Sequence, residues 1–210
     1  MTSLEYKLHY QRHLPHYQPH GATLFITFRL AGSLPLAVIQ QLEMEVLEKE
    51  TAIANIADAD IRRDAMRTAR KQLFARWDAA LDSASSGPRW LSVPTIANMV
   101  CDELLYLDER MYTLEAYCVM PNHVHLVLSP SKNGDGIIPL SKIMHVLKGK
   151  TARQANLVLG RQGAFWQHES YDHVVRDQEE LNRIVNYVLN NPRRAGLPDR
   201  WIYRKDETGL

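Results

Sequence analysis

The stretch YCVMPNHVHLVLSP, residues 117–130, decides how the rest of the chain is interpreted. Apolar residues fill both of its halves and Pro121-Asn122 interrupts them, which predicts a strand, a tight turn and a second strand. His123 and His125 lie two residues apart on the second strand. Because successive side chains of a strand point to opposite faces, both imidazoles are expected on one face of a sheet.

Two neutral imidazoles side by side on a strand supply half of the ligands of a metal site. The alternative is that both histidines are polar residues on the solvated face of an antiparallel sheet. The turn before the pair and a tyrosine-bearing helix farther along the chain favour the metal site.

Length and composition indicate a single globular domain. The chain has 210 residues, of which 45% are hydrophobic and 23% charged. No apolar run is long enough for a transmembrane helix, and the first 21 residues have no apolar signal core. The two cysteines form neither a CxxC motif nor a disulfide framework, so we expect a cytoplasmic protein with reduced thiols and no membrane partner.

Positive charge is concentrated near the C-terminus. The net charge of the whole chain is only +1, but residues 141–205 hold twelve Lys and Arg against six Asp and Glu. A basic surface of this kind is compatible with phosphate binding. A solvated helical face is the alternative, and charge alone does not separate the two.

The remaining elements follow from periodicity and turn residues. The expected order is an N-terminal arm over 1–21, a strand over 22–30, two helices over about 36–50 and 58–84, a helix from Pro94 to about 107, strands over 112–120 and 123–129, a helix over about 139–159, a strand in the second half of 165–177, and a last helix. The helical hairpin at about 36–84 is interpreted as an insertion into the core domain.

The last helix begins at Asp177, an N-cap residue, and Glu180 follows at the capping-box position. We expect this helix to run to about Asn190 and to be stopped by Pro192. Its apolar residues recur at the spacing of a buried helical stripe. They are Leu181, Ile184, Val185 and Val188.

Tyr187 lies beside that stripe, and Asn191 follows one turn later on the same flank. Tyr187 can therefore present its hydroxyl to a neighbouring site. The alternative is a tyrosine at the boundary of the core, with its ring packed and its hydroxyl in water. Helical geometry alone does not exclude Tyr171 as a competitor.

Three motifs in this order resemble the REP-associated tyrosine transposases, which belong to the single-tyrosine HUH transposase superfamily. They are MPNHVHLVL at 120–128, FWQHESYDHVVRD at 165–177 and NYVLNNPRRAGL at 186–197. The opening HLPHYQPHGATLFITFRLAGSLP and the linker GPRWL look like the same family. The helical hairpin makes the chain longer than compact members.

The resemblance implies an α+β fold, with a ferredoxin-like antiparallel sheet, packed helices and the inserted hairpin. His123 and His125 would be the metal ligands, and Tyr187 matches the nucleophile of the family. Asn191 matches the position of a further polar metal ligand, where related members often have Gln. The implied cofactor is a divalent ion, Mg²⁺ or Mn²⁺.

The implied reaction is attack of Tyr187 on a phosphodiester of single-stranded DNA, which gives a 5′-phosphotyrosine and a free 3′-OH. The resemblance implies folded REP hairpins as the recognised DNA, with the N-terminal arm reading a short flanking tetranucleotide. The candidate DNA-binding residues are Arg12, Lys148, Lys150, Arg153, Arg193 and Arg194.

Three functions stay open at this point. The first is this DNA strand-transfer nuclease. The second is a domesticated nucleic-acid-binding module with little or no cleavage activity. The third is a metal-dependent hydrolase that uses water, with Tyr187 as a structural residue. The sequence also leaves open whether the protein is a monomer or a homodimer.

Overall fold

The computed structural model describes residues 21–134 and 136–205. The described residues divide into two compact units, 32–87 on the one hand and 21–31 with 88–205 on the other. The predicted N-terminal arm, apart from Gly21, lies outside the described residues, and so does Arg12. None of the described helices combines the length and the apolar character that crossing a membrane requires.

The unit formed by 32–87 is a helical hairpin of α1 (Leu36–Ala54) and α2 (Ala59–Ser83). Asp58 caps α2, because its carboxylate accepts hydrogen bonds from the backbone N–H groups of Asp60 and Ile61 at 2.9 Å. Each helix has one buried apolar stripe, which is the pattern of two helices that pack lengthwise. The buried apolar residues are Leu42, Val46 and Ile53 in α1, and Ala69, Leu73 and Leu81 in α2.

The described residues of the other unit form a five-stranded antiparallel sheet in the order β6-β1-β3-β2-β7. The strands are β1 (Leu24–Leu30), β2 (Tyr112–Val119), β3 (His123–Pro130), β6 (Trp166–Val174) and β7 (Ile202–Arg204). The helices are α3 (Pro94–Leu107), α4 (Leu140–Val158) and α5 (Gln178–Arg194). The short elements are η1 (Trp90–Ser92), β4 (Lys132–Asn133) and β5 (Gly136–Ile137).

This connectivity confirms the predicted ferredoxin-like sheet with packed helices. The chain runs β1-α3-β2-β3-α4-β6, and the sheet order of these strands is fourth, first, third, second. β7 extends the sheet at the edge of β2, where the rings of Tyr117 and Tyr203 stack with their centroids 5.7 Å apart.

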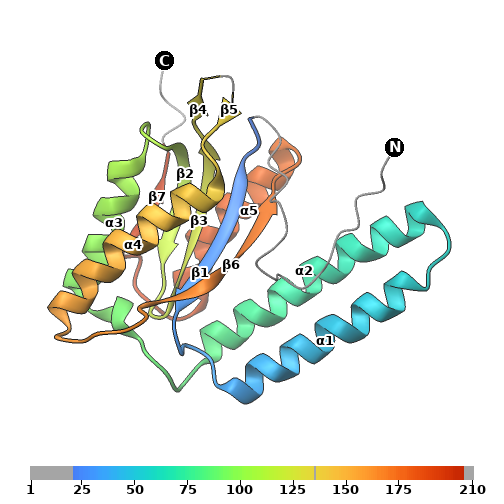
Figure 1. Cartoon of the computed structure of the whole chain (residues 1–210), viewed down its shortest axis with the longest axis horizontal. Helices are drawn as coiled ribbons and strands as arrows, with labels where there is room; N and C mark the ends of the chain where they lie inside the picture. Colours follow the sequence, from blue (N-terminus) through green and yellow to red (C-terminus); the bar gives the residue numbers. More distant parts are fainter. Residues whose placement is uncertain (1–20, 135, 206–210) are drawn as a thin grey trace. The chain divides into compact units, whose positions relative to one another are not determined.

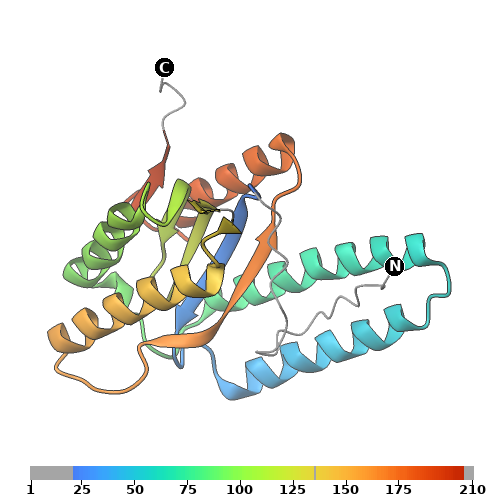
Figure 2. The same cartoon turned by 45° about the horizontal axis from the view of Figure 1, so that its top comes forward.

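The two faces of the sheet have different covers. Figures 1 and 2 show α3 and α4 on one face and α5 on the other. In β3, Val124, Leu126 and Leu128 belong to the main core together with residues of α3 and α4. Because strand side chains alternate, His123 and His125 lie on the opposite face, which α5 covers.

The prediction that Pro192 stops the last helix is wrong, because α5 continues to Arg194 with Pro192 inside its final turn. The end of α5 is instead a Schellman motif centred on Gly196, whose φ is +68°. The N–H of Leu197 donates to the carbonyl of Pro192, and the N–H of Gly196 donates to that of Arg193. Asn191 therefore lies within α5, and the helical backbone sets the direction in which its side chain leaves the helix.

Candidate active site on the face covered by α5

The two histidines of β3 project from the middle of the sheet and are fully buried. The turn before them is held by two backbone bonds, from Met120 N–H to the carbonyl of His123 and from Leu30 N–H to the carbonyl of Asn122. Burial of both rings contradicts the alternative in which they lie on a solvated face of the sheet.

Hydrogen bonds at the Nδ1 atoms orient both rings. His123 Nδ1 is 2.7 Å from Oδ1 of Asn122, and since a carbonyl oxygen only accepts, this Nδ1 carries the hydrogen. The Nε2 of His123 then holds a lone pair. His125 Nδ1 is 2.8 Å from Oγ1 of Thr27, the residue opposite it on β1. Such outer partners fix the ring orientation of metal-binding histidines.

The Nε2 atoms of His123 and His125 are 3.1 Å apart. Two nitrogens bound to one ion at about 2.1 Å each, with an angle between the tetrahedral and the right angle, lie about 3.0–3.4 Å apart. The observed separation therefore suits a shared cation.

Asn191 of α5 adds a third candidate metal ligand beside this pair of histidines. It is 1% exposed, and its Nδ2 is 3.4 Å from Nε2 of His125. Its Oδ1 is buried and has no hydrogen-bond partner among the described residues. Rotation of the amide exchanges Nδ2 and Oδ1, so Asn191 can present an oxygen to a cation beside the two imidazoles.

Tyr187 lies one turn before Asn191 and contacts the same histidine. Its ring centroid is 5.5 Å from that of His125, with the ring planes inclined by 67°. Phe25 of β1 stacks on His125 at 5.7 Å and meets the Tyr187 ring edge to face at 6.1 Å. Three aromatic rings from β1, β3 and α5 thus hold one another in place.

Several other tyrosines are poor candidates for a nucleophile. Burial raises the pKa of Tyr112 and Tyr117 well above the usual value, so both are harder to ionise. Tyr112 also donates its hydroxyl hydrogen to the carbonyl of Leu104. Tyr171, the competitor left open by the sequence, packs its ring against Phe25 at 6.3 Å. The ring contact between Tyr187 and His125 therefore favours Tyr187 over these three tyrosines.

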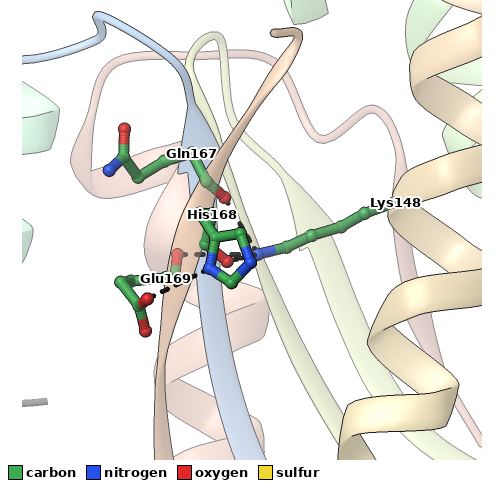
Figure 3. A network of polar contacts seen from close by, with 4 residues as sticks. All are labelled: Lys148, Gln167, His168 and Glu169. Atoms are coloured by element: carbon green, nitrogen blue, oxygen red, sulfur yellow. Dashed lines mark hydrogen bonds and ion pairs between the residues drawn. The ribbon is translucent and has the colours of Figure 1, made fainter. Parts of the chain in front are cut away.

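Lys148, a predicted DNA-binding residue, reaches from α4 to the backbone of β6 (Figure 3). Its Nζ donates to the carbonyls of Gln167, His168 and Glu169 at 3.1, 3.0 and 3.5 Å. These carbonyls lie in a β-bulge, where the pairing with β1 shifts register. Burial lowers the pKa of Lys148 to about 8.

The other predicted DNA-binding residues have varied surroundings. Lys150 forms an ion pair with buried Glu103 at 2.5 Å, and Arg193 forms one with Asp199 at 3.0 Å. Arg153 is exposed on α4. The guanidinium of Arg194 lies 5.6 Å from the centroid of the Tyr187 ring. Of the described basic candidates, Arg194 is thus the one with a contact to the Tyr187 ring.

Sequence reasoning missed Asn122, Thr27 and Phe25, which orient the site. The sequence does offer one indication for Thr27, which is a polar residue within the otherwise mostly apolar strand ATLFITFRL. The register that places Thr27 opposite His125 and Phe25 opposite Val127 depends on the pairing of β1 with β3, which no local pattern gives.

Comparisons with known proteins agree with the sequence motifs. Residues 101–191 match the family described as Transposase IS200 like. This range contains the candidate metal ligands and the candidate nucleophile, which are His123, His125, Asn191 and Tyr187. A protein of Haemophilus influenzae named as a REP-associated tyrosine transposase is 29% identical over 87 residues, which are 39% of this chain. The match spans about half of that relative, 49% of its length.

A solved structure is described as a REP-associated tyrosine transposase bound to a REP hairpin. The alignment covers 89% of this chain and 75% of the chain in that structure. The TM-score is 0.48 and the identity is 14%. The family match and the curated relative confirm the resemblance to the REP-associated tyrosine transposases that the three motifs indicated.

Proposed function

We propose that this relative of the REP-associated tyrosine transposases is a metal-dependent enzyme that cuts and rejoins single-stranded DNA through a 5′-phosphotyrosine. The observation that carries the proposal is the contact between Tyr187 and His125, a member of a buried histidine pair with Nε2 atoms 3.1 Å apart. A nucleophile and a candidate cation site are thus adjacent, as phosphodiester cleavage requires.

The residues that would hold the ion are His123, His125 and Asn191. The buried Oδ1 of Asn191, without a hydrogen-bond partner among the described residues, supports this assignment. When bound, a divalent ion would polarise a non-bridging phosphate oxygen and so make the phosphorus more electrophilic. Two nitrogens and one amide oxygen suit Mn²⁺ by ligand type, whereas cellular abundance favours Mg²⁺.

Tyr187 is the proposed nucleophile. Its phenolic oxygen bonds to phosphorus while the bond from phosphorus to the 3′-oxygen of the leaving strand breaks. The phenol loses its proton and the leaving oxygen gains one, so the products are a phosphotyrosine and a free 3′-OH. An ordinary tyrosine pKa is about 10, so ionisation of Tyr187 needs a nearby positive charge. The guanidinium of Arg194, beside the Tyr187 ring, is one such charge.

The covalent step retains the energy of the phosphodiester. A second 3′-OH can attack the phosphotyrosine, which releases Tyr187 and joins two strands without an external energy source. This reversal distinguishes a strand transferase from a nuclease that uses water. The aromatic packing of Tyr187 against Phe25 and His125 supports a role for this residue at the reacting centre.

Single-stranded DNA with a REP-type hairpin is the proposed substrate, by resemblance to the named family. Exposed Arg153 and Arg194 are available to bind phosphates. The proposed reading of a flanking tetranucleotide by the arm at 1–21, which includes Arg12, concerns residues outside the described ranges. A cytoplasmic location completes the proposal.

The test is incubation with labelled single-stranded REP-hairpin DNA and Mn²⁺ or Mg²⁺, followed by a denaturing gel. We expect a DNA-shifted protein band that is absent in Tyr187→Phe, while hairpin binding is retained. Tyr171→Phe is the matched control and should keep the band. Hairpin binding without any adduct would favour the binding module, and cleavage without an adduct would favour water as the nucleophile.

A further inference from the structure

We infer that His173 and Glu180 are positioning residues, whose ion pair fixes the start of α5 to β6 and thereby sets the place of Tyr187. The inference rests on the proposed function, because it assigns a role in the reaction of Tyr187. Its evidence is a set of contacts between the end of β6 and the first turn of α5.

The carboxylate of Glu180 connects strand and helix. His173 Nε2 is 3.2 Å from Oε1 of Glu180, and the backbone N–H of Arg176 donates to Oε2 at 3.0 Å. Only 19% of the His173 side chain and 8% of the Glu180 side chain are exposed. The contact is a hydrogen bond, and an ion pair when His173 is protonated; sheltered in this way, it is screened less by water and salt than a surface pair.

The capping of α5 does not need this ion pair. The carboxylate of Asp177 accepts a hydrogen bond from the N–H of Glu180 at 2.7 Å, as an N-cap residue does. The side chain of Glu180 has a separate function, because it bonds to β6 and to the connection before the helix. The pair therefore adds a lateral attachment to a helix start that is already capped.

The pair also lies next to the aromatic cluster of the site. His173 is the partner of Phe25 in the antiparallel pairing of β6 with β1, so the two side chains are neighbours on one face of the sheet. Phe25 in turn contacts the rings of His125 and Tyr187. A continuous series of contacts thus leads from Glu180 to the candidate nucleophile.

Helix geometry gives the consequence for Tyr187. Tyr187 lies seven positions after Glu180, about two helical turns or roughly 10 Å along the axis. A tilt of about 10° at the first turn would move Tyr187 by roughly 2 Å. A displacement of about 1 Å at a reacting group can reduce a rate by about 100-fold.

The experiment compares His173→Ala, His173→Gln and Glu180→Gln with the wild type. The readouts are the single-turnover rate of phosphotyrosine formation and the Kd for the hairpin. We expect adduct formation to slow by about 10- to 100-fold in His173→Ala, while the Kd changes by less than about 2-fold. His173→Gln, which can still donate a hydrogen bond to Glu180, should recover most of the rate.

Two matched controls are available in the same elements. His168 forms an exposed ion pair with Glu169 in β6, and Glu179 forms one with Arg183 in the first turn of α5. His168→Ala and Glu179→Gln should react at the wild-type rate.

The outcomes separate this inference from the proposed function. If the wild type forms the adduct and His173→Ala forms it as fast as His168→Ala does, the positioning role is overturned and the proposed function stands. Equal losses of rate and of hairpin affinity would likewise replace positioning by general destabilisation. If the wild type forms no adduct with any metal, the proposed function fails and this inference fails with it.

Discussion

The Nε2 atoms of His123 and His125 face each other at 3.1 Å inside a buried site. Asn122 fixes the lone pair of His123 toward this contact, and the amide N–H of Asn191 is directed at His125 Nε2 from 3.4 Å. Because His123 Nδ1 donates to Asn122, its Nε2 is an acceptor, and an acceptor this close to a second ring nitrogen is stabilised by a proton or a cation between them. The arrangement is therefore suited to bind a metal ion.

The first prediction concerns the effect of metal on stability. Mn²⁺ at about 100 times its Kd should raise the free energy of unfolding by about 2.7 kcal/mol, since the ion binds only the folded site. Thermal unfolding with and without Mn²⁺ measures this. His125→Ala should show no increase, whereas His145→Ala, with an exposed imidazole on α4, should behave like the wild type. An equal increase in His125→Ala would place the metal elsewhere.

Removal of an outer partner should weaken the metal site without removing a ligand. Thr27→Val keeps the shape of the side chain but loses the hydrogen bond to His125 Nδ1. Loss of such a partner typically lowers metal affinity by about 10- to 100-fold. Calorimetric titration with Mn²⁺ measures the change. Thr23→Val is the control, because Thr23 bonds to Ser129 instead; the same affinity in both variants would contradict the role of Thr27.

Asn191→Asp should strengthen metal binding. The substitution replaces a buried amide oxygen by a charged one in the same position, and added ligand charge raises the affinity for divalent cations. We expect an increase of about 10-fold in Mn²⁺ affinity, and a decrease in Asn191→Leu, which offers no donor atom. Asn190→Asp, at an exposed position of α5, should have little effect. Unchanged affinity in both Asn191 variants would exclude Asn191 as a ligand.

The pH dependence of stability should reveal the partly buried ammonium of Lys148. Its pKa is about 8 in the folded protein against an ordinary 10.5, so between these values the unfolded chain binds more protons than the folded chain. The stability of the wild type should therefore rise relative to Lys148→Met as the pH increases from about 8 to 10.5. Urea unfolding at several pH values measures this difference, and a constant difference would contradict the burial of this charge.

Gly196→Ala should destabilise the end of α5. A Cβ at Gly196 meets no atom within 4 Å, so the cost comes from its φ of +68° alone and should be about 1 kcal/mol. Thermal unfolding measures this cost. Gly149→Ala is the control, because Gly149 lies inside α4 with equally open space around it. There alanine favours the helix and should stabilise by up to about 1 kcal/mol. A neutral Gly196→Ala would contradict the Schellman end.

Local patterns in the sequence determined the central hairpin and the direction of the candidate site residues on their own strand and helix. Apolar residues on both sides of Pro121-Asn122 predicted the hairpin of β2 and β3. The two-residue spacing of His123 and His125 placed both on one face, because successive side chains of a strand point to opposite faces. Helical spacing likewise placed Tyr187 and Asn191 on one flank of α5. The predicted end of α5 failed because a proline in the last turn removes only one backbone hydrogen bond, while Gly196 provides the actual stop.

Only the tertiary structure decided which residues meet. Strand register set Thr27 against His125, and the packing of α5 brought Tyr187 and Asn191 to the same imidazole, across 62 and 66 positions of sequence. The tertiary structure also decided the partners of Lys148, whose Nζ donates hydrogen bonds to three backbone carbonyls of β6. These contacts come from register and helix docking, which depend on the burial of whole faces and not on any short segment.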